Sequence, residues 1–243
     1  MSGNLIKLHN ISFSYPGETM VLDGLDFTLA ERERIGLVGP NGCGKTTLFY
    51  LIMGLVKPAS GTLEMFGKQI SGEKDFRQIR EKVGFLFQNS DDQLFSPTVM
   101  EDVAFGPLNL GKSREEVQTI VNETLAMLGI GGFENRISHK LSYGEKKLVA
   151  LATVLAMQPE VLILDEPTAG LDEAMMERLV DILNGLNLPS VVTSHDMDFL
   201  AGVTDKIHGM SEGRILPEDQ ASVHSHIHVH KGGIYPHTHS DLG

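Results

Sequence analysis

Apolar and polar residues alternate in the first part of the chain, a pattern typical of half-buried strands. The alternation predicts a strand over Leu5–Phe13 and a second, shorter strand over Leu25–Leu29. The mostly apolar run Arg34–Val38 predicts a buried strand that leads into a glycine-rich loop. A helix is predicted from Lys45 to Leu55, and Lys57-Pro58 is expected to end it.

The spacing of apolar residues becomes helical between about residues 90 and 157. One predicted helix face carries Val117, Ile120, Val121, Leu125 and Leu128. Strands and helices are predicted before and after this region over Val83–Phe87, Val161–Leu164, Glu173–Leu186, Ser190–Thr193, Met197–Gly202 and Lys206–Met210. This alternation predicts an α/β fold with a mostly parallel sheet whose faces are covered.

Composition and charge narrow the class of protein. With 243 residues, 41% of them apolar, the chain is long enough for one sizeable core. Its formal net charge of -12 argues against a nucleic-acid surface, which needs clustered Lys and Arg. The single cysteine, Cys43, allows no internal disulfide and fits a reducing compartment. Residues 1–10 lack the features of a signal peptide, and no apolar run is long enough to span a membrane.

The glycine-rich loop matches the phosphate-binding pattern G-x-x-x-x-G-K-[ST] without a mismatch. Its residues are Gly39, Pro40, Asn41, Gly42, Cys43, Gly44, Lys45 and Thr46. The glycines let backbone N–H groups approach phosphate oxygens, and the N-terminus of the following helix favours the same anions. Lys45 supplies a charge for the outer phosphates and Thr46 a hydroxyl for Mg²⁺. The loop therefore predicts a nucleotide site.

Two carboxylates end the later apolar strand Val161–Leu164. Asp165 and Glu166 follow it directly, where an unpaired charge would be costly. Taken alone, the pair fits either a catalytic site or a strand-end cap with a surface carboxylate.

The stretch Leu141-Ser142-Tyr143-Gly144-Glu145 lies between these two nucleotide motifs. The order of the three motifs resembles the ATP-binding-cassette family, and the resemblance covers about residues 4–216. It implies a P-loop ATPase fold with a mostly parallel core sheet, an N-terminal antiparallel β subdomain and a helical subdomain over about residues 90–157. The sequence departs from the commonest L-S-G-G-Q form at Tyr143 and Glu145.

The same resemblance assigns roles at the nucleotide site. It implies that Asp165 orders Mg²⁺ together with Thr46 and Gln88, and that Glu166 is the general base, worth roughly 10²–10⁴ in rate. Tyr15 matches the aromatic that stacks on adenine, although a lone tyrosine on a strand fits a core position equally well. His195 matches the γ-phosphate contact. The implied ATP-binding residues are Tyr15, Gly39, Pro40, Asn41, Gly42, Cys43, Gly44, Lys45, Thr46, Thr47, Gln88, Ser142, Gly144, Glu145 and Asp165.

The signature also implies an oligomeric state. Ser142 and Gly144 stand where a helix is predicted to begin, so the hydroxyl and backbone N–H groups there can cap an anion. In the family these groups face ATP held by the opposite subunit, and Asp172 matches the loop that crosses to that subunit. One P-loop and one signature in the chain therefore imply a homodimer.

The residues after Gln88 indicate a branch of the family. The block Asn89–Phe95, followed by Ser96–Val99 and Glu101–Pro107, resembles the ATPases of energy-coupling-factor importers, with Ser90 in place of the proline of their P-D-x-Q-like motif. Lys146-Lys147 fits the same group. These importers pair two ATPases with an integral membrane coupling subunit and a substrate-binding membrane subunit.

The C-terminal tail is rich in histidine. His224, His226, His228 and His230 alternate, and His237 and His239 follow after a spacer. Alternate residues of an extended segment share a face, so four imidazoles can converge on Ni²⁺, Co²⁺, Zn²⁺ or Cu²⁺. The same composition also fits a solvated low-complexity end or an added tag.

The interpretation that follows is the ATPase subunit of a nickel or cobalt importer, peripheral on the cytoplasmic face of the membrane. It comprises an ATPase domain over 1–216 and a flexible tail over 217–243. Three alternatives remain: the same machine importing a vitamin, a cassette ATPase not linked to a membrane, and a metal-storage or metal-sensing protein. The complete set of hydrolytic motifs disfavours the last of these.

Overall fold

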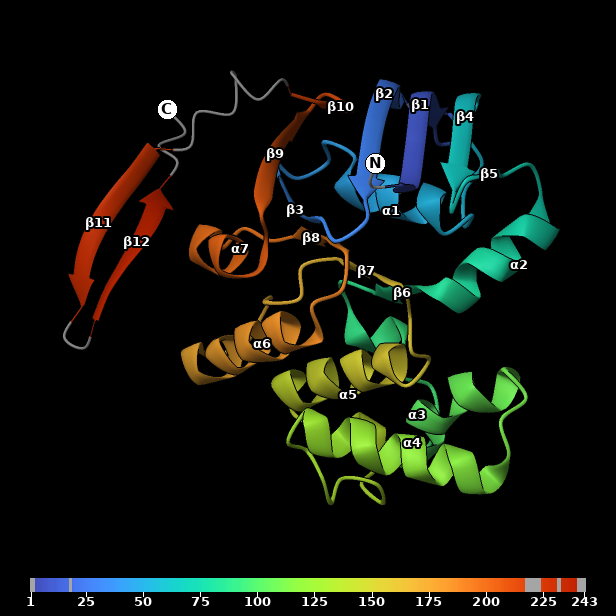
Figure 1. Cartoon of the computed structure of the whole chain (residues 1–243), viewed down its shortest axis with the longest axis vertical. Helices are drawn as coiled ribbons and strands as arrows, with labels where there is room; N and C mark the ends of the chain where they lie inside the picture. Colours follow the sequence, from blue (N-terminus) through green and yellow to red (C-terminus); the bar gives the residue numbers. More distant parts are fainter. Residues whose placement is uncertain (1–2, 18, 217–223, 231–232, 240–243) are drawn as a thin grey trace. The chain divides into compact units, whose positions relative to one another are not determined.

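The computed structural model of the chain describes residues 3–17, 19–216, 224–230 and 233–239, with the backbone alone for the last two ranges (Figure 1). The chain divides into two units, one built from 1–72 and 189–243 and the other from 73–188. Among the described residues, no helix combines the length and the apolar sequence needed to cross a bilayer.

The first unit contains an antiparallel sheet with the strand order β2-β1-β4-β5. Its strands are β1 (Asn4–Ser14), β2 (Met20–Ala30), β4 (Ser60–Met65) and β5 (Lys68–Gln69). The predicted alternation buries Ile6 and Leu8, and after a register shift between Leu8 and Ile11 it continues with Ile11 and Phe13 buried. Figure 1 shows β1 between β2 and β4. β2 begins five residues before the predicted Leu25, and β4 and β5 have no counterpart among the predicted elements.

The first unit also contains the strands that carry the glycine-rich loop, in the order β10-β9-β3-β8. β3 (Arg34–Val38) pairs in parallel with β8 (Ser190–Thr193) and with β9 (Lys206–Ser211). β10 (Arg214–Ile215) pairs with β9 in the antiparallel sense. The helices of this unit are α1 (Lys45–Ile52) and α7 (Met197–Val203).

Helix α1 ends three residues earlier than predicted, because of Gly54. Gly54 adopts φ 68° and donates its N–H to the Leu51 carbonyl at 3.1 Å. Leu55 donates its N–H to the Tyr50 carbonyl at 2.8 Å. This pair of bonds is a Schellman motif, which satisfies the last carbonyls of the helix before Lys57-Pro58 is reached.

The second unit contains a parallel strand pair and most of the helices. β6 (Val83–Leu86) pairs in parallel with β7 (Val161–Leu164). The helical elements are α2 (Glu73–Lys82), η1 (Ser90–Asp92), α3 (Val99–Asn109), α4 (Arg114–Met127), η2 (Ser138–Lys140), α5 (Tyr143–Leu155) and α6 (Glu173–Leu186). The pairings in both units confirm the predicted α/β fold with mostly parallel core strands.

Local signals explain where the helices of the second unit begin. Thr98, Ser113 and Ser142 each form a capping box with the glutamate three residues later. The predicted apolar face of α4 is buried at Val117 and Val121, and α3, α4 and α5 pack against one another (Figure 1).

The C-terminal tail contains two paired strands, β11 (His224–His230) and β12 (Gly233–His239). They pair in the antiparallel sense, with His224 opposite His239 and His226 opposite His237. The prediction of a flexible tail from residue 217 falls partly on 217–223, 231–232 and 240–243, which lie outside the described residues.

The loop that begins at Gln88 is held by Gln93. The Gln93 side chain accepts the Phe87 N–H at 3.2 Å and donates to the Ala150 carbonyl at 2.9 Å and the Thr153 hydroxyl at 2.8 Å. These bonds fix the end of β6 to α5. Asn89 caps η1 by accepting the Asp91 N–H.

Ser90, at the first position of η1, places a polar side chain in a buried position. It is 1% exposed, and within the described part of the chain its hydroxyl oxygen has no hydrogen-bond partner. The preceding Asn89 adopts φ -98° and ψ 117°, an extended conformation that is compatible with a following proline.

We expect Ser90→Pro to stabilise the protein. The substitution removes a buried, unsatisfied hydroxyl, and proline restricts the unfolded chain, an effect of about 0.4–1 kcal/mol by itself. The melting temperature should rise by about 2–4 °C for each kcal/mol gained. Ser90→Ala is the control, because it removes only the hydroxyl. A melting temperature for Ser90→Pro below that of Ser90→Ala would contradict this account of the loop.

Candidate functional site

The glycine-rich loop runs from the end of β3 to the start of α1. A Cβ atom on Gly39 would overlap the Met210 carbonyl, so this glycine is required by the packing of the loop against β9. Gly42 faces open space but adopts φ 79°, a conformation that L residues other than glycine rarely take. The structure thus gives each of these glycines a local reason in addition to phosphate access.

Lys45 is held inside this loop. Its side chain is buried, and its ammonium group donates to the Gly39 carbonyl at 2.7 Å and the Pro40 carbonyl at 3.3 Å. The charge is therefore concentrated at the loop, with Asn41 and Gly42 exposed around it. Such an arrangement attracts an anion.

Tyr15 and His195 belong to the same unit as this loop. The Tyr15 hydroxyl lies 3.3 Å from that of Thr47 on α1, and its half-exposed ring packs edge-on against Phe13 at 4.9 Å between ring centroids. His195 is exposed and follows β8, whose Thr193 pairs with Leu37 of β3. Because carboxyl ends of neighbouring parallel strands lie at one edge, His195 and the loop share that edge.

The second unit carries the two carboxylates. Asp165 is 1% exposed and donates its N–H to the Leu86 carbonyl at 3.0 Å, and Glu166 is 7% exposed. Glu166 adopts φ 48°, which costs a residue other than glycine about 1–2 kcal/mol. Backbone strain of this kind is concentrated at functional sites. Gln88 follows the neighbouring strand β6, so it reaches the same strand ends as the carboxylates.

Lys147 on α5 is a charged residue of this region that carries none of the predicted roles at the site. It is 1% exposed, and its ammonium group donates to the Gln88 carbonyl at 2.7 Å. Burial lowers the pKa of the Lys147 ammonium to about 8, while the attraction of Asp165 and Glu166 raises it. The one signal in the sequence was a lysine on the otherwise apolar face of a helix.

The signature residues begin α5. The Ser142 hydroxyl accepts the Glu145 N–H at 3.3 Å, and the Glu145 carboxylate accepts the Ser142 N–H at 2.9 Å. The same carboxylate forms an ion pair with Arg136 at 2.9 Å. The pKa of Glu145 is held below its ordinary value, first by the Ser142 N–H, then by the Ser142 hydroxyl, with a smaller contribution from Arg136.

Tyr143 connects the signature to the loop before α6. A Cβ atom on Gly170 would lie 2.7 Å from the Tyr143 ring, so only glycine fits beside it, and Gly170 adopts φ 73°. Asp172, two residues later, caps α6 by accepting the Met175 N–H at 2.9 Å. The unusual tyrosine of the signature thus packs on the segment that contains Asp172.

The predicted site residues are divided between the units. The first unit contains Tyr15, residues 39–47 and His195, and the second contains Gln88, residues 142–145, residues 165–166 and Asp172. Among the residues whose side chains are described, no group of three or more His, Cys, Asp or Glu residues is arranged to hold a metal ion. The side chains of the six tail histidines lie outside those described.

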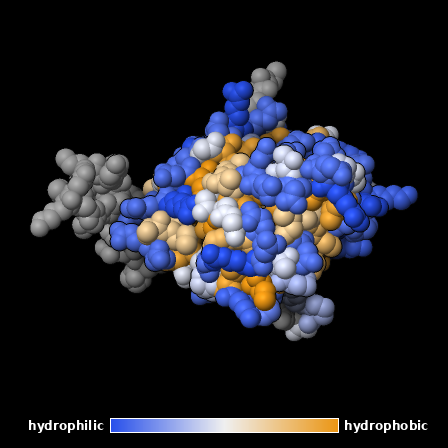
Figure 2. All heavy atoms as spheres, turned by 90° about the horizontal axis from the view of Figure 1, so that it is seen from below, coloured by the Kyte–Doolittle hydropathy of each residue, from blue (hydrophilic) through white to orange (hydrophobic). Residues whose placement is uncertain are grey.

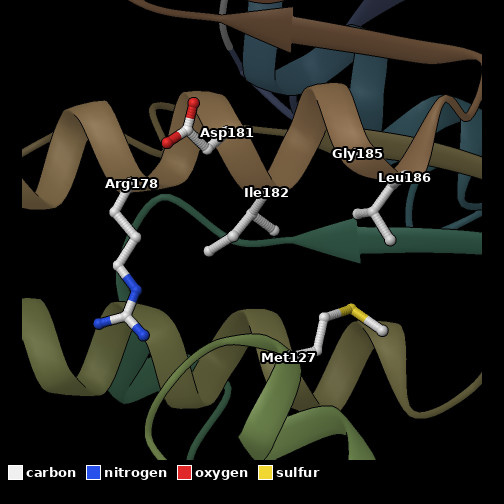
Figure 3. Close-up of a pocket in the computed structure, with 6 residues that line it drawn as sticks. All are labelled: Met127, Arg178, Asp181, Ile182, Gly185 and Leu186. Atoms are coloured by element: carbon white, nitrogen blue, oxygen red, sulfur yellow. The ribbon is translucent and has the colours of Figure 1, made fainter.

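A cavity of about 480 Å³ lies elsewhere in the second unit, between the end of α4 and α6 (Figure 3). Arg178 and Asp181 supply its polar groups, and its other lining residues are Met127, Ile182, Gly185 and Leu186. It contains none of the predicted site residues. The Arg178 guanidinium lies against Gly129, just after the end of α4.

Comparison with known proteins agrees with the nucleotide-binding motifs of this chain. The family described as ABC transporter matches residues 22–169. The energy-coupling factor transporter ATP-binding protein EcfA of Methanocaldococcus jannaschii is 45% identical over 218 residues, covering 88% of this chain and 78% of the relative.

Two solved structures have the same fold. CbiO1 of Clostridium perfringens, part of the ABC transporter complex CbiONQ, is 36% identical, with a TM-score of 0.78 over 88% of this chain and 87% of that one. The ATP-binding cassette MJ0796, a dimer in a post-hydrolysis state bound to ADP and Pi, is 28% identical, with a TM-score of 0.80 over 87% of this chain and 97% of that one. The chain therefore belongs to the ABC transporter family, as an ATP-hydrolysing cassette subunit.

Proposed function

We propose that this chain powers an energy-coupling-factor type importer of Ni²⁺ or Co²⁺, as a homodimer bound to the cytoplasmic face of the membrane. The similarity to EcfA and to CbiO1 supports the type of machine. The observation that carries the hydrolytic role is the buried, strained Glu166 directly after Asp165 at the end of β7.

In this proposal, the predicted site residues have different parts in the reaction. Tyr15 stacks on adenine, the backbone of residues 39–44 and Lys45 bind the phosphates, and His195 contacts the γ-phosphate. Glu166 accepts a proton from the attacking water, and its fixed backbone limits the positions that the carboxylate can take.

The oxygen donors of Thr46, Gln88 and Asp165 fit Mg²⁺, which prefers hard oxygen ligands. When bound, Mg²⁺ neutralises negative charge on the phosphates. A buried aspartate at a strand end suits this role, because bound Mg²⁺ compensates a charge that is costly to bury alone.

Ser142 and Gly144 contact the nucleotide of the other subunit in the proposed dimer. Ser142 is exposed at the N-terminus of a helix of 13 residues, where anions are favoured. The dimeric MJ0796 structure supports this assembly. In the proposed dimer, Asp172 lies in the segment that reaches the partner.

An exposed aromatic pair supports the proposal that the chain binds a membrane partner. Phe95 and Phe105 are 67% and 49% exposed, and their rings meet edge-on at 4.9 Å between centroids. Leu108 and Leu110, at the end of α3, are also exposed. Figure 2, which views the molecule from below Figure 1, shows that hydrophobic residues are exposed among hydrophilic ones on its surface. Phe95, Phe105, Leu108 and Leu110 form an exposed apolar cluster, here called the docking patch. We assign it to contact with the membrane coupling subunit, since exposed apolar clusters mark protein interfaces.

The histidine positions of the tail support the proposal that the imported substrate is a metal ion. In the β11–β12 register, His224 and His226 stand opposite His239 and His237. Positions two apart on a strand and positions directly opposite share one face of a hairpin, so all six histidine positions belong to one face. Imidazole is a suitable ligand for Ni²⁺ and Co²⁺.

Copurification of membrane proteins tests the proposed function in an importer. Glu166→Gln protein, pulled down from native membranes with MgATP in detergent, should bring two integral membrane proteins with it. Recovery of ribosomes, or of no membrane protein, would move the function to a cassette ATPase that works without a membrane.

We expect Glu166→Gln to bind ATP normally but to hydrolyse it roughly 10²–10⁴-fold more slowly, because the general base is lost while the fold is kept. Steady-state phosphate release and nucleotide binding by the purified full chain measure the two effects. The control is Glu160→Gln, a carboxylate paired with Lys82 at the surface just before β7. Normal turnover by Glu166→Gln would remove Glu166 from the mechanism.

Replacing both rings of the docking patch, as in Phe95→Ser with Phe105→Ser, should reduce copurification of the coupling subunit by more than about tenfold, since buried aromatic anchors carry most of an interface's affinity. Thermal stability should change little, because both side chains are exposed. Met127→Ser changes an apolar residue that is 55% exposed and outside the patch, and serves as the control. Equal copurification by all three proteins would place the partner elsewhere.

Joint replacement of His237 and His239 by asparagine should weaken Ni²⁺ binding by about tenfold or more, since loss of even a second-shell partner of a metal ligand typically costs roughly 10–100-fold. Isothermal titration with Ni²⁺ and Co²⁺ measures this effect, with joint replacement of His228 and His230 for comparison. If only the replacement of His228 and His230 weakens Ni²⁺ binding, the metal is bound by the strand β11 alone and not by the hairpin. ATP hydrolysis and transport that do not respond to Ni²⁺ or Co²⁺, with or without residues 217–243, would favour a vitamin as cargo.

A further inference from the structure

Three side-chain contacts join α5 to the loop that begins at Gln88. The Lys146 ammonium forms an ion pair with Asp91 at 2.6 Å, and the Lys147 ammonium donates to the Gln88 carbonyl at 2.7 Å. Farther along the helix, the Gln93 amide donates to Ala150 and Thr153. The helix that begins with the signature serine therefore holds the start, middle and end of this loop.

Lys147 differs from the other two contacts because it is buried close to the adjacent ends of β6 and β7, where the hydrolytic carboxylates lie. Its side chain is 1% exposed, whereas Lys146 and Asp91 are paired at the surface. Asp165 and Glu166 are both buried and attract the Lys147 charge. A buried cation is stable only with such compensation, and two buried carboxylates repel each other without it.

We propose that Lys147 is a positioning residue that links the carboxylates at the end of β7 to the backbone of Gln88. The buried ammonium group holds the Gln88 carbonyl at 2.7 Å, and the Asp165 N–H bond to the Leu86 carbonyl places the carboxylates at the adjacent strand end. Gln88 leads through η1 to Phe95 of the docking patch, so this bond connects the chemistry with the partner surface. The connection from Gln88 to Phe95 rests on the proposed docking patch. The link from Lys147 to Gln88 and the carboxylates lies wholly within the second unit.

The chain offers a matched set of variants for this inference. Lys147→Met removes the charge and the hydrogen bond at similar volume, Lys147→Arg keeps both, and Lys146→Met removes the neighbouring surface ion pair from the same helix. Each full-length protein is assayed for the kcat and KM of ATP hydrolysis, and for hydrogen exchange of the Asp92, Gln93 and Leu94 amides. These amides are bonded within the loop, to the Asn89 and Ser90 carbonyls.

We expect Lys147→Met to lower kcat by about 10- to 100-fold, as small displacements of catalytic groups do, with the KM for ATP unchanged. The three loop amides should exchange faster, Lys147→Arg should restore most of the rate, and Lys146→Met should resemble the parent. A purely structural defect would change KM and kcat together and would not be rescued by arginine.

Either a normal kcat in Lys147→Met or an equal loss in Lys146→Met overturns the proposal. If Lys147→Met does not fold, Lys147→Gln replaces it, because glutamine lacks the charge but keeps a donor. Glu166→Gln, assayed in parallel, separates the two hypotheses. If it also retains full turnover, the hydrolytic assignment itself is wrong, and if it alone is slow, only the role of Lys147 is rejected.

Discussion

The compensation of buried charge at the carboxyl ends of parallel strands is the constraint on which the proposed site depends. In the first unit, the Lys45 ammonium is held by two loop carbonyls after β3. In the second, Asp165 and Glu166 follow β7 and attract the buried ammonium group of Lys147. Apolar strands place these groups where water is excluded, so each buried charge needs polar or charged partners. The charges are consequently fixed in position before any ligand arrives.

The two departures from the commonest signature have structural explanations. Glu145 completes the capping box with Ser142, as glutamine also can, but its charge adds the ion pair to Arg136. Tyr143 occupies the space beside Gly170, a contact that a glycine at position 143 cannot make. Both changes tie the start of α5 to neighbouring segments. The signature of this chain is therefore adapted to its own surroundings and keeps its serine and second glycine.

Helix α5 connects several features that are far apart in the sequence. Its first residue follows the signature serine, its first turns hold the loop after Gln88, and Lys147 faces the carboxylates after β7. The loop continues to Phe95 and the docking patch. In the proposed function, this single helix connects hydrolysis with the membrane partner, because a rigid element moves all its attached groups together.

The sequence by itself determined the elements with strong local signals. The alternation in Leu5–Phe13, the apolar run Arg34–Val38 and the helical period of Glu173–Leu186 all correspond to elements with nearly the predicted bounds. Motif spacing was enough to identify the family, since the glycine loop, the signature and the paired carboxylates each occupy contiguous residues. The end of α1 was predicted wrongly, because a Schellman motif at Gly54 outweighs a proline four residues later.

Only the tertiary structure decided the contacts between segments. It showed that Lys147 reaches Gln88, 59 residues away in sequence, and that Gln93 is a structural clamp on α5. It also showed that Tyr143 packs on Gly170. Local pattern cannot give these results, because a buried charge or amide is satisfied by whichever distant group the fold brings to it. Periodicity and motif spacing determine the secondary structure and the family. Packing determines which side chains form ion pairs and hydrogen bonds with one another.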